Sequence, residues 1–146
     1  MPSFKDSKIQ FHFLVNSFVL GNRSILKDFI SNTLRSHSRK LGHLTFIFCT
    51  DKYLLDINKK FLSHNYYTDI ITFDLSDTKE LEAEIYISID RVRDNAHQLG
   101  KTFKEELHRV IFHGVLHLCG FNDKSIRQRK EMRIREDELL GKYFNS

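Results

Sequence analysis

Alternation of apolar and polar residues marks the first strand of the chain. In IQFHFLV, residues 9–15, every odd-numbered position is apolar, and this period of two is typical of a strand with one buried face. Residues 44–49 and 84–89 are rich in β-branched and aromatic side chains, and residues 68–75 share that character, so each segment predicts a further strand. Only eight residues separate the last two strands, and we therefore expect them to pair directly.

Apolar residues at helical spacing predict a helix after each of the first two strands. The first helix runs from Asn22 to about His37 and carries one apolar stripe that faces a core. Thr50 can cap the second helix, because a threonine hydroxyl accepts a hydrogen bond from an amide of the first turn. The residues expected to face inward on the second helix are Tyr53, Leu54, Ile57 and Phe61.

Three more helices follow the fourth strand. Asp90 and Gly100 are the residue types expected at the start and at the end of the third helix. Thr102 opens a fourth helix, 103–118, which is apolar over most of its surface, and Ser125 opens a charged fifth helix. The predicted order βαβαββααα indicates an α+β fold in which one small, mixed, four-stranded sheet is covered by helices.

Composition limits the kinds of protein that this chain can be. Its 146 residues are expected to form a single domain, 1–146. No apolar run approaches the roughly 20 residues of a membrane span, and the start MPSFKDSKIQ lacks the apolar core of a signal peptide, which favours a cytoplasmic protein without a membrane partner. Cys49 and Cys119 lie in apolar segments and are expected to be buried thiols with no disulfide partner. The net charge of +4 permits an anionic partner but does not require one.

The fourth helix carries the residues with the clearest chemistry. His113 and His117 are four residues apart, so both imidazoles project from one face, about 6 Å apart along the axis, and can reach one ion. Gly120 can adopt the left-handed conformation that ends a helix and turns the chain back, which brings Asp123 to the same point. Three protein ligands with an open position are typical of a catalytic zinc site. We therefore predict that His113, His117 and Asp123 bind one divalent metal ion, with zinc as the expected ion.

The residue after the first histidine separates this pattern from that of zinc peptidases. Peptidases of the HExxH type use the glutamate at that position as a general base, whereas this chain has Gly114. A metal ion can still polarise a phosphoryl oxygen, and a phosphate brings its own metal-seeking oxygens. The pattern favours phosphodiester cleavage over peptide hydrolysis, and it leaves the catalytic proton-transfer residue unknown.

The segment HGVLHLCGFND resembles the signature HGxLHLxGYDH of the YbeY-type rRNA maturation factors, a family of single-domain, metal-dependent endoribonucleases. Upstream, INKKFLSHNYYTDIITFDL resembles the family block LNxxYRxxxxPTDVLSF, and AEIYISIDRVRDNA resembles the GDIxIS segment with its following helix. The resemblance covers most of residues 54–123. It implies an α+β fold with a small mixed sheet, and it implies that zinc or a similar ion is held by His113, His117 and Asp123.

Two departures from the family pattern bear on the chemistry. The third ligand is usually histidine, and here Asp123 takes its place; an oxygen ligand suits zinc but also suits harder ions. The family arginine that is thought to act near the scissile phosphate falls at Leu62, and a leucine cannot stabilise the charge of a phosphate.

Other residues are candidates for contact with the substrate. Basic residues near Leu62 can replace the missing arginine, although lysines on a helix are often simply solvated. The family's TD pair is kept, either as a wall of the cleft or as the ordinary entry to a strand. The segment RQRKEMRIRE is either an RNA contact or the charged face of a helix. The individual residues that are candidates for substrate contact are Lys59, Lys60, His64, Thr68 and Asp69.

The resemblance implies a metal-dependent endoribonuclease that acts in maturation, including 3′-end processing, and in quality control of small-subunit ribosomal RNA. Its partners would then be ribosomal RNA and the small ribosomal subunit. Two alternatives stay open. In the first, the protein is a ribosome-associated binding factor with a mainly structural metal, and Leu62 marks lost catalysis. In the second, it is a zinc peptidase, which the histidine spacing suggests and Gly114 opposes.

Overall fold

A computed structural model describes residues 8–145 of the chain. Within this part the elements follow the predicted order βαβαββααα, and the predicted α+β fold is confirmed. The strands are β1 (Ile9–Phe13), β2 (Lys40–Cys49), β3 (Ile70–Asp74) and β4 (Glu80–Ser88). The helices are α1 (Arg23–Ser36), α2 (Asp51–Leu62), α3 (Ile89–Leu99), α4 (Phe103–Leu118) and α5 (Ile126–Phe144).

The strands form one mixed sheet in the order β1-β2-β4-β3. β1 and β4 both run parallel to β2, whereas β3 runs antiparallel to β4, which confirms that the last two strands pair directly. β2 begins at Lys40, earlier than predicted, because an irregularity in register next to Gly42 lets the strand continue alongside β4. β3 is an edge strand, with a neighbour on one side only.

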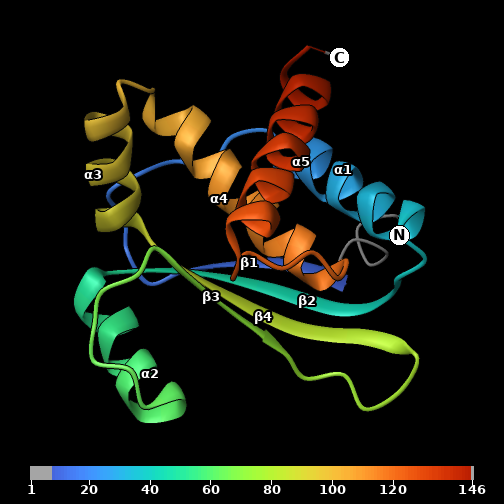
Figure 1. Cartoon of the computed structure of the whole chain (residues 1–146), viewed down its shortest axis with the longest axis horizontal. Helices are drawn as coiled ribbons and strands as arrows, with labels where there is room; N and C mark the ends of the chain where they lie inside the picture. Colours follow the sequence, from blue (N-terminus) through green and yellow to red (C-terminus); the bar gives the residue numbers. More distant parts are fainter. Residues whose placement is uncertain (1–7, 146) are drawn as a thin grey trace.

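Helices cover the two faces of the sheet unequally. Figure 1 shows α1, α4 and α5 on one face and α2 on the other. The first face carries the main core, in which Phe46, Phe48 and Phe112 are almost completely buried. Burying side chains of this size stabilises the fold by about 1.5–3 kcal/mol each. A second, smaller cluster lies between α2 and the sheet and consists of Cys49, Leu54 and Ile71.

The small size of this second cluster explains an error in the prediction for α2. Leu54 is buried as predicted, but Tyr53 is 41% exposed and Phe61 is 59% exposed. The buried position in the second half of the helix is Asn58, a polar residue. Its side-chain amide donates a hydrogen bond to the Tyr66 carbonyl at 2.9 Å. α2 therefore leaves aromatic side chains at the surface.

The cap of α3 also differs from the prediction. The Ser88 hydroxyl accepts a hydrogen bond from the Arg91 amide and forms the N-terminal cap, in place of Asp90. The Asp90 carboxylate instead accepts a hydrogen bond from the Asp51 amide, at the start of α2. The predicted aspartate thus links two helices that lie next to each other.

Neither cysteine is part of a disulfide. Cys49 is buried and Cys119 is partly buried, and both are free thiols. Burial raises the pKa of Cys49 to about 12 and that of Cys119 to about 11, so both thiols stay protonated near neutral pH. Across residues 8–145, we find no helix with the length and apolar character needed to cross a membrane.

Candidate metal centre

α4 directs its two central histidines toward one point in space. His113 and His117 lie one turn apart, and their Nε2 atoms are 3.0 Å from each other. Beyond the helix, Gly120 has a φ of 101°, a conformation that favours glycine, and the chain turns back there as predicted. As a result, Oδ2 of Asp123 lies 3.2 Å from Nε2 of His113 and 3.4 Å from Nε2 of His117.

These three side chains have the geometry of ligands to a single ion. Donor atoms held about 2.0–2.2 Å from a tetrahedral zinc ion lie roughly 3.3–3.5 Å from one another. The three separations here are 3.0, 3.2 and 3.4 Å. Within residues 8–145, His113, His117 and Asp123 are the one set of three such residues close enough to share an ion. Two nitrogen donors and one oxygen donor suit zinc and also harder divalent ions.

A carboxylate from α5 orients the first histidine. Oε2 of Glu136 lies 2.6 Å from Nδ1 of His113, and Oε1 of Glu136 accepts a hydrogen bond from Arg109 at 3.0 Å. Arg109 also donates to Asp137, at 2.7 Å. A carboxylate at Nδ1 favours the tautomer in which Nδ1 carries the proton and Nε2 is free to bind a metal. Glu136 is the outer partner that metal-binding histidines commonly have.

Sequence reasoning missed Glu136. It lies 23 residues from His113 in a helix rich in charges of both signs, and no motif distinguishes it from its neighbours. A partial signal exists, because Glu136, which is 6% exposed, lies on the same face of the helix as the buried Met132, one turn earlier. A buried glutamate on a helix needs a partner, but this requirement does not show which residue the partner is.

Burial and the nearby carboxylates act in opposite directions on the two histidines. Burial lowers the pKa of His113, but the hydrogen bond and charge of Glu136 outweigh it and hold the pKa above its ordinary value. Burial, followed by the charge of His113, lowers the pKa of His117. The second histidine is therefore kept in the neutral form that a metal ligand requires.

Gly114 occupies the position at which zinc peptidases have a glutamate, and packing accounts for the glycine. A Cβ atom at this position would lie 2.9 Å from Cδ1 of Ile70 and 3.0 Å from Cδ1 of Ile85. These distances are shorter than the ordinary contact between carbon atoms, about 3.5–4.0 Å. The position therefore faces the sheet, and α4 approaches β3 and β4 closely because Gly114 has no side chain.

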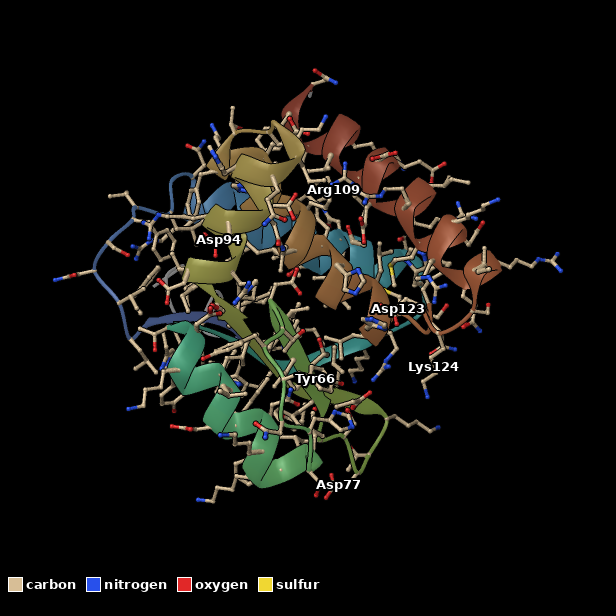
Figure 2. The ribbon with its side chains drawn as sticks, turned by 60° about the vertical axis from the view of Figure 1, so that its left-hand side comes forward. Tyr66, Asp77, Asp94, Arg109, Asp123 and Lys124 are labelled. Atoms are coloured by element: carbon tan, nitrogen blue, oxygen red, sulfur yellow. The ribbon has the colours of Figure 1, made fainter. Side chains whose placement is uncertain are left out.

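The three candidate ligands line a cavity of about 650 Å³ whose other walls come from β3, α3 and α5. Figure 2 shows Arg109 and Asp123 on the side of the molecule where α4 meets α5. Thr68 and Asp69, directly before β3, lie in the cavity wall. Asp69 accepts a hydrogen bond from the Asn95 amide at 3.2 Å, and burial raises the pKa of its carboxyl group.

The other three substrate candidates lie outside this cavity. Lys59, Lys60 and His64 are exposed on α2 and on the loop that follows it, and none of them lines the cavity. The His64 ring stacks on Tyr66, with ring centroids 5.1 Å apart. Leu62, at the place of the family arginine, is 39% exposed on the same helix and also lies outside the cavity lining.

Arginines from α4 and α5 supply the positive charge of the cavity. Arg129 and Arg133 are one turn apart on α5, and both line the cavity together with Arg109. Arg109 is paired with carboxylates, whereas neither Arg129 nor Arg133 forms an ion pair with any residue in the described part of the chain. The segment RQRKEMRIRE contains both, but its spacing alone does not reveal which basic side chains face α4.

Fold and site together define an α+β protein whose central helix, with the turn that follows it, offers three candidate metal ligands in a cavity lined by arginines. Comparison with known proteins identifies one family within this class of protein. A family model described as Endoribonuclease YbeY matches residues 19–144, and the chain belongs to the YbeY family.

Relatives from two bacteria agree with this assignment. A Bacteroides thetaiotaomicron protein named Endoribonuclease YbeY is 45% identical over 114 residues, which cover 78% of this chain and 83% of the relative. A Cytophaga hutchinsonii protein of the same name is 43% identical over 138 residues, which cover 94% of this chain and 96% of the relative. The solution structure of TM1509 from Thermotoga maritima shares the fold, with a TM-score of 0.59 and 23% identity over 94% of this chain and 89% of that one.

Proposed function

We propose that this protein is a divalent-metal-dependent endoribonuclease that acts on small-subunit ribosomal RNA, in 3′-end processing and in quality control. The observation that carries the proposal is the group of His113, His117 and Asp123 in a cavity that also holds arginines with no ion pair among residues 8–145. Membership of a family whose members are named endoribonucleases supports RNA as the substrate. Zinc is the proposed ion, the small ribosomal subunit the proposed partner and the cytoplasm the proposed location.

The residues that line the cavity have distinct roles in the proposed cleavage of RNA. His113, His117 and Asp123 would hold the ion, which when bound supplies the positive charge that polarises a phosphoryl oxygen and acidifies water. Glu136 keeps His113 in the tautomer that binds a metal. Arginine guanidinium groups form strong, charge-assisted hydrogen bonds with phosphate oxygens.

Arg129 and Arg133 are therefore proposed to hold the RNA backbone on either side of the cleaved bond. They place in the cavity the positive charge that Leu62 cannot supply. Thr68 and Asp69 are proposed to contact the RNA from the opposite wall.

Substrate contacts beyond the cavity are also proposed. Lys59, Lys60 and His64 are exposed on the α2 face and would meet RNA only where it leaves the cavity. We do not propose a peptidase, because Gly114 is packed against the sheet and leaves no room for the glutamate that such an enzyme needs there.

Cleavage of RNA by the purified protein tests the enzymatic part of the proposal. Zinc-loaded protein is incubated with single-stranded and with structured RNA, beside His113→Ala and a matched control, His97→Ala, whose histidine is exposed on α3. Cleavage by wild type and by His97→Ala, with loss in His113→Ala and after chelation, is the expected result. Equal RNA cleavage by wild type and His113→Ala, with any divalent ion, would contradict the proposal.

The binding-factor alternative has one observation in its favour, the leucine at position 62. The two functions differ in what they require of the metal ligands. In a bacterium that lacks its own family member, a folded His113→Ala variant should fail to restore mature 3′ ends of small-subunit ribosomal RNA. Full restoration by this variant would favour a binding factor over a nuclease.

A further inference from the structure

One carboxyl group in the cavity wall, that of Glu106, has no role in the metal centre described above. Glu106, on α4, is 5% exposed, and its Oε1 atom has no hydrogen-bond partner among the described residues. Both oxygens of the nearby Glu136 are paired, by contrast, with Arg109 and His113. Burying a carboxyl oxygen without a donor is unfavourable. Glu106 lines the metal cavity, where the charges of Arg109 and Arg133 act on it without a hydrogen bond to Oε1, so a donor on a bound molecule can supply that partner.

A second unpaired atom lines the same cavity. The Thr72 hydroxyl, on β3, is buried and also has no hydrogen-bond partner. Of the three such buried side-chain atoms in residues 8–145, these two lie in cavity-lining residues, and the third, Nε of Arg91, does not. Two unpaired polar groups in the wall of one cavity make it suited to a polar ligand.

The surroundings of Glu106 resemble a small-molecule subsite. The cavity wall near Glu106 combines polar and apolar side chains from α3, α4 and the segment before β3. Asn95 donates to Asp69, whose charge acts on Glu106, while Leu99 is 52% exposed and supplies apolar surface. A few polar groups beside an apolar surface are what recognises a planar, hydrogen-bonding ring.

The spacing along α4 sets the size of the ligand. Glu106 and His113 are seven residues apart, so they lie on the same helical face, about 10.5 Å apart along the axis. Both line the cavity, as does Val110 between them. A nucleotide has a suitable length, because its phosphate and the far edge of its base are separated by a distance of this order.

We propose that the Glu106 end of the cavity is a nucleobase subsite, in which the Glu106 carboxyl group accepts hydrogen bonds from the Watson–Crick edge of the nucleotide next to the cleaved bond. This inference rests on the proposed RNA substrate. Guanine is the base expected to bind best, because its adjacent N1–H and N2–H donors match the two oxygens of one carboxyl group. Uracil is expected to bind worst, because it presents a single imino donor flanked by carbonyl oxygens.

Cleavage of RNAs that differ in one base tests the subsite. Short single-stranded RNAs carry each of the four bases in turn on either side of the cleaved bond. Wild type should prefer guanine on one side by about 5- to 100-fold, the range of discrimination for one good base contact. Glu106→Gln should reduce this preference severalfold, since glutamine replaces one acceptor oxygen with a donor. Glu105→Gln is the matched control, because Glu105 pairs only with Lys101, at 3.6 Å, on the exposed face.

A binding measurement separates failure of the subsite from failure of the proposed function. The four nucleoside 5′-monophosphates are titrated into zinc-loaded protein and followed by calorimetry. Preference for guanosine monophosphate, lost in Glu106→Gln and kept in Glu105→Gln, supports the subsite even if no RNA is cleaved. If wild type cleaves RNA but Glu106→Gln changes the rate equally for all four bases, the subsite is wrong and the nuclease stands. Equal affinity of wild type for the four nucleotides likewise overturns the subsite.

Discussion

The two faces of the sheet carry basic residues in different settings. On the α2 face, Lys59 and Lys60 are exposed beside surface aromatics and lie outside the cavity of the candidate metal ligands. On the α4 face, Arg129 and Arg133 line the cavity that holds the candidate metal ligands. The α2 residues are close in sequence to the position of the family arginine, Leu62, whereas the α5 residues are more than sixty positions away from it.

This difference shows that position in the family pattern and position in the site need not coincide. A helix that packs on a small cluster, such as α2, presents its charges to solvent. A helix that packs across α4, such as α5, brings buried and exposed charges to the same cavity. Glu136 on α5 is buried and paired, and one turn away Arg133 on the same helix is exposed.

Removing the carboxylate of Glu136 should have the largest effect. Glu136→Gln is expected to weaken zinc binding by about 10- to 100-fold, the usual loss when the outer partner of a ligand histidine is changed. Calorimetric titration of zinc into metal-free protein measures the effect. Glu138→Gln is the matched control, because Glu138 is on the same helix and pairs with Arg135 at the surface, at 3.0 Å. An unchanged Kd in Glu136→Gln would show that Glu136 does not support the metal centre.

Removing the two cavity arginines compares the two faces directly. In a His113→Ala background, which keeps the RNA intact, Arg129→Ala with Arg133→Ala should weaken binding of single-stranded RNA about tenfold and reduce the salt dependence by roughly 1.4, the value for two phosphate contacts. Lys59→Ala with Lys60→Ala should have a smaller effect on both quantities. Fluorescence anisotropy at several salt concentrations measures them. Equal losses in the two double variants would mean that RNA does not favour the cavity face.

Adding one methyl group between α4 and the sheet tests the close packing of the cavity face. Gly114→Ala is expected to lower the free energy of unfolding by up to about 2 kcal/mol, because overpacking against Ile70 and Ile85 exceeds the gain in helix propensity. Gly141→Ala is the matched control, because no atom lies within 4 Å of a Cβ there, and it should stabilise α5 by about 0.5–1 kcal/mol. Urea unfolding measures both variants. A similar gain in both would contradict the tight contact at Gly114.

A third histidine of α4, His108, should make the stability of the fold depend on pH. His108 is 3% exposed and its ring stacks on Tyr143, and burial lowers its pKa in the folded protein. Below about pH 6.5, the ordinary value, the unfolded chain therefore binds more protons than the folded one, and acid reduces the stability.

The variant His108→Phe keeps a ring but has nothing to titrate. Between pH 7.5 and pH 5.5, with chelator present, the unfolding free energy of wild type should fall by about 1 kcal/mol relative to that of the variant. A constant difference between the two proteins over this range would show that His108 is not held neutral by the core.

Part of the fold and of the site follows from short-range spacing in the sequence. His113 and His117 share a face of α4 because four residues make slightly more than one turn, and Gly120 turns the chain because it tolerates a positive φ. The pairing of β3 with β4 follows from the short connection between them. The candidate metal-binding group and the α+β order were predictable for this reason, since each depends on residues close together in the chain.

The other features of the fold and of the candidate site depend on tertiary packing. The contact between Glu136 and His113 joins residues 23 positions apart, and it exists because α5 crosses α4 at one rotation and not at another. The same rotation places Arg129 in the cavity, and the size of the core beneath α2 determines that Phe61 is exposed. Hydrophobic periodicity tells which side of a helix is buried, but it carries no information about which neighbour that side meets. Short-range spacing thus accounts for the two candidate ligands on α4, whereas the packing of α5 on α4 accounts for the charges that surround them.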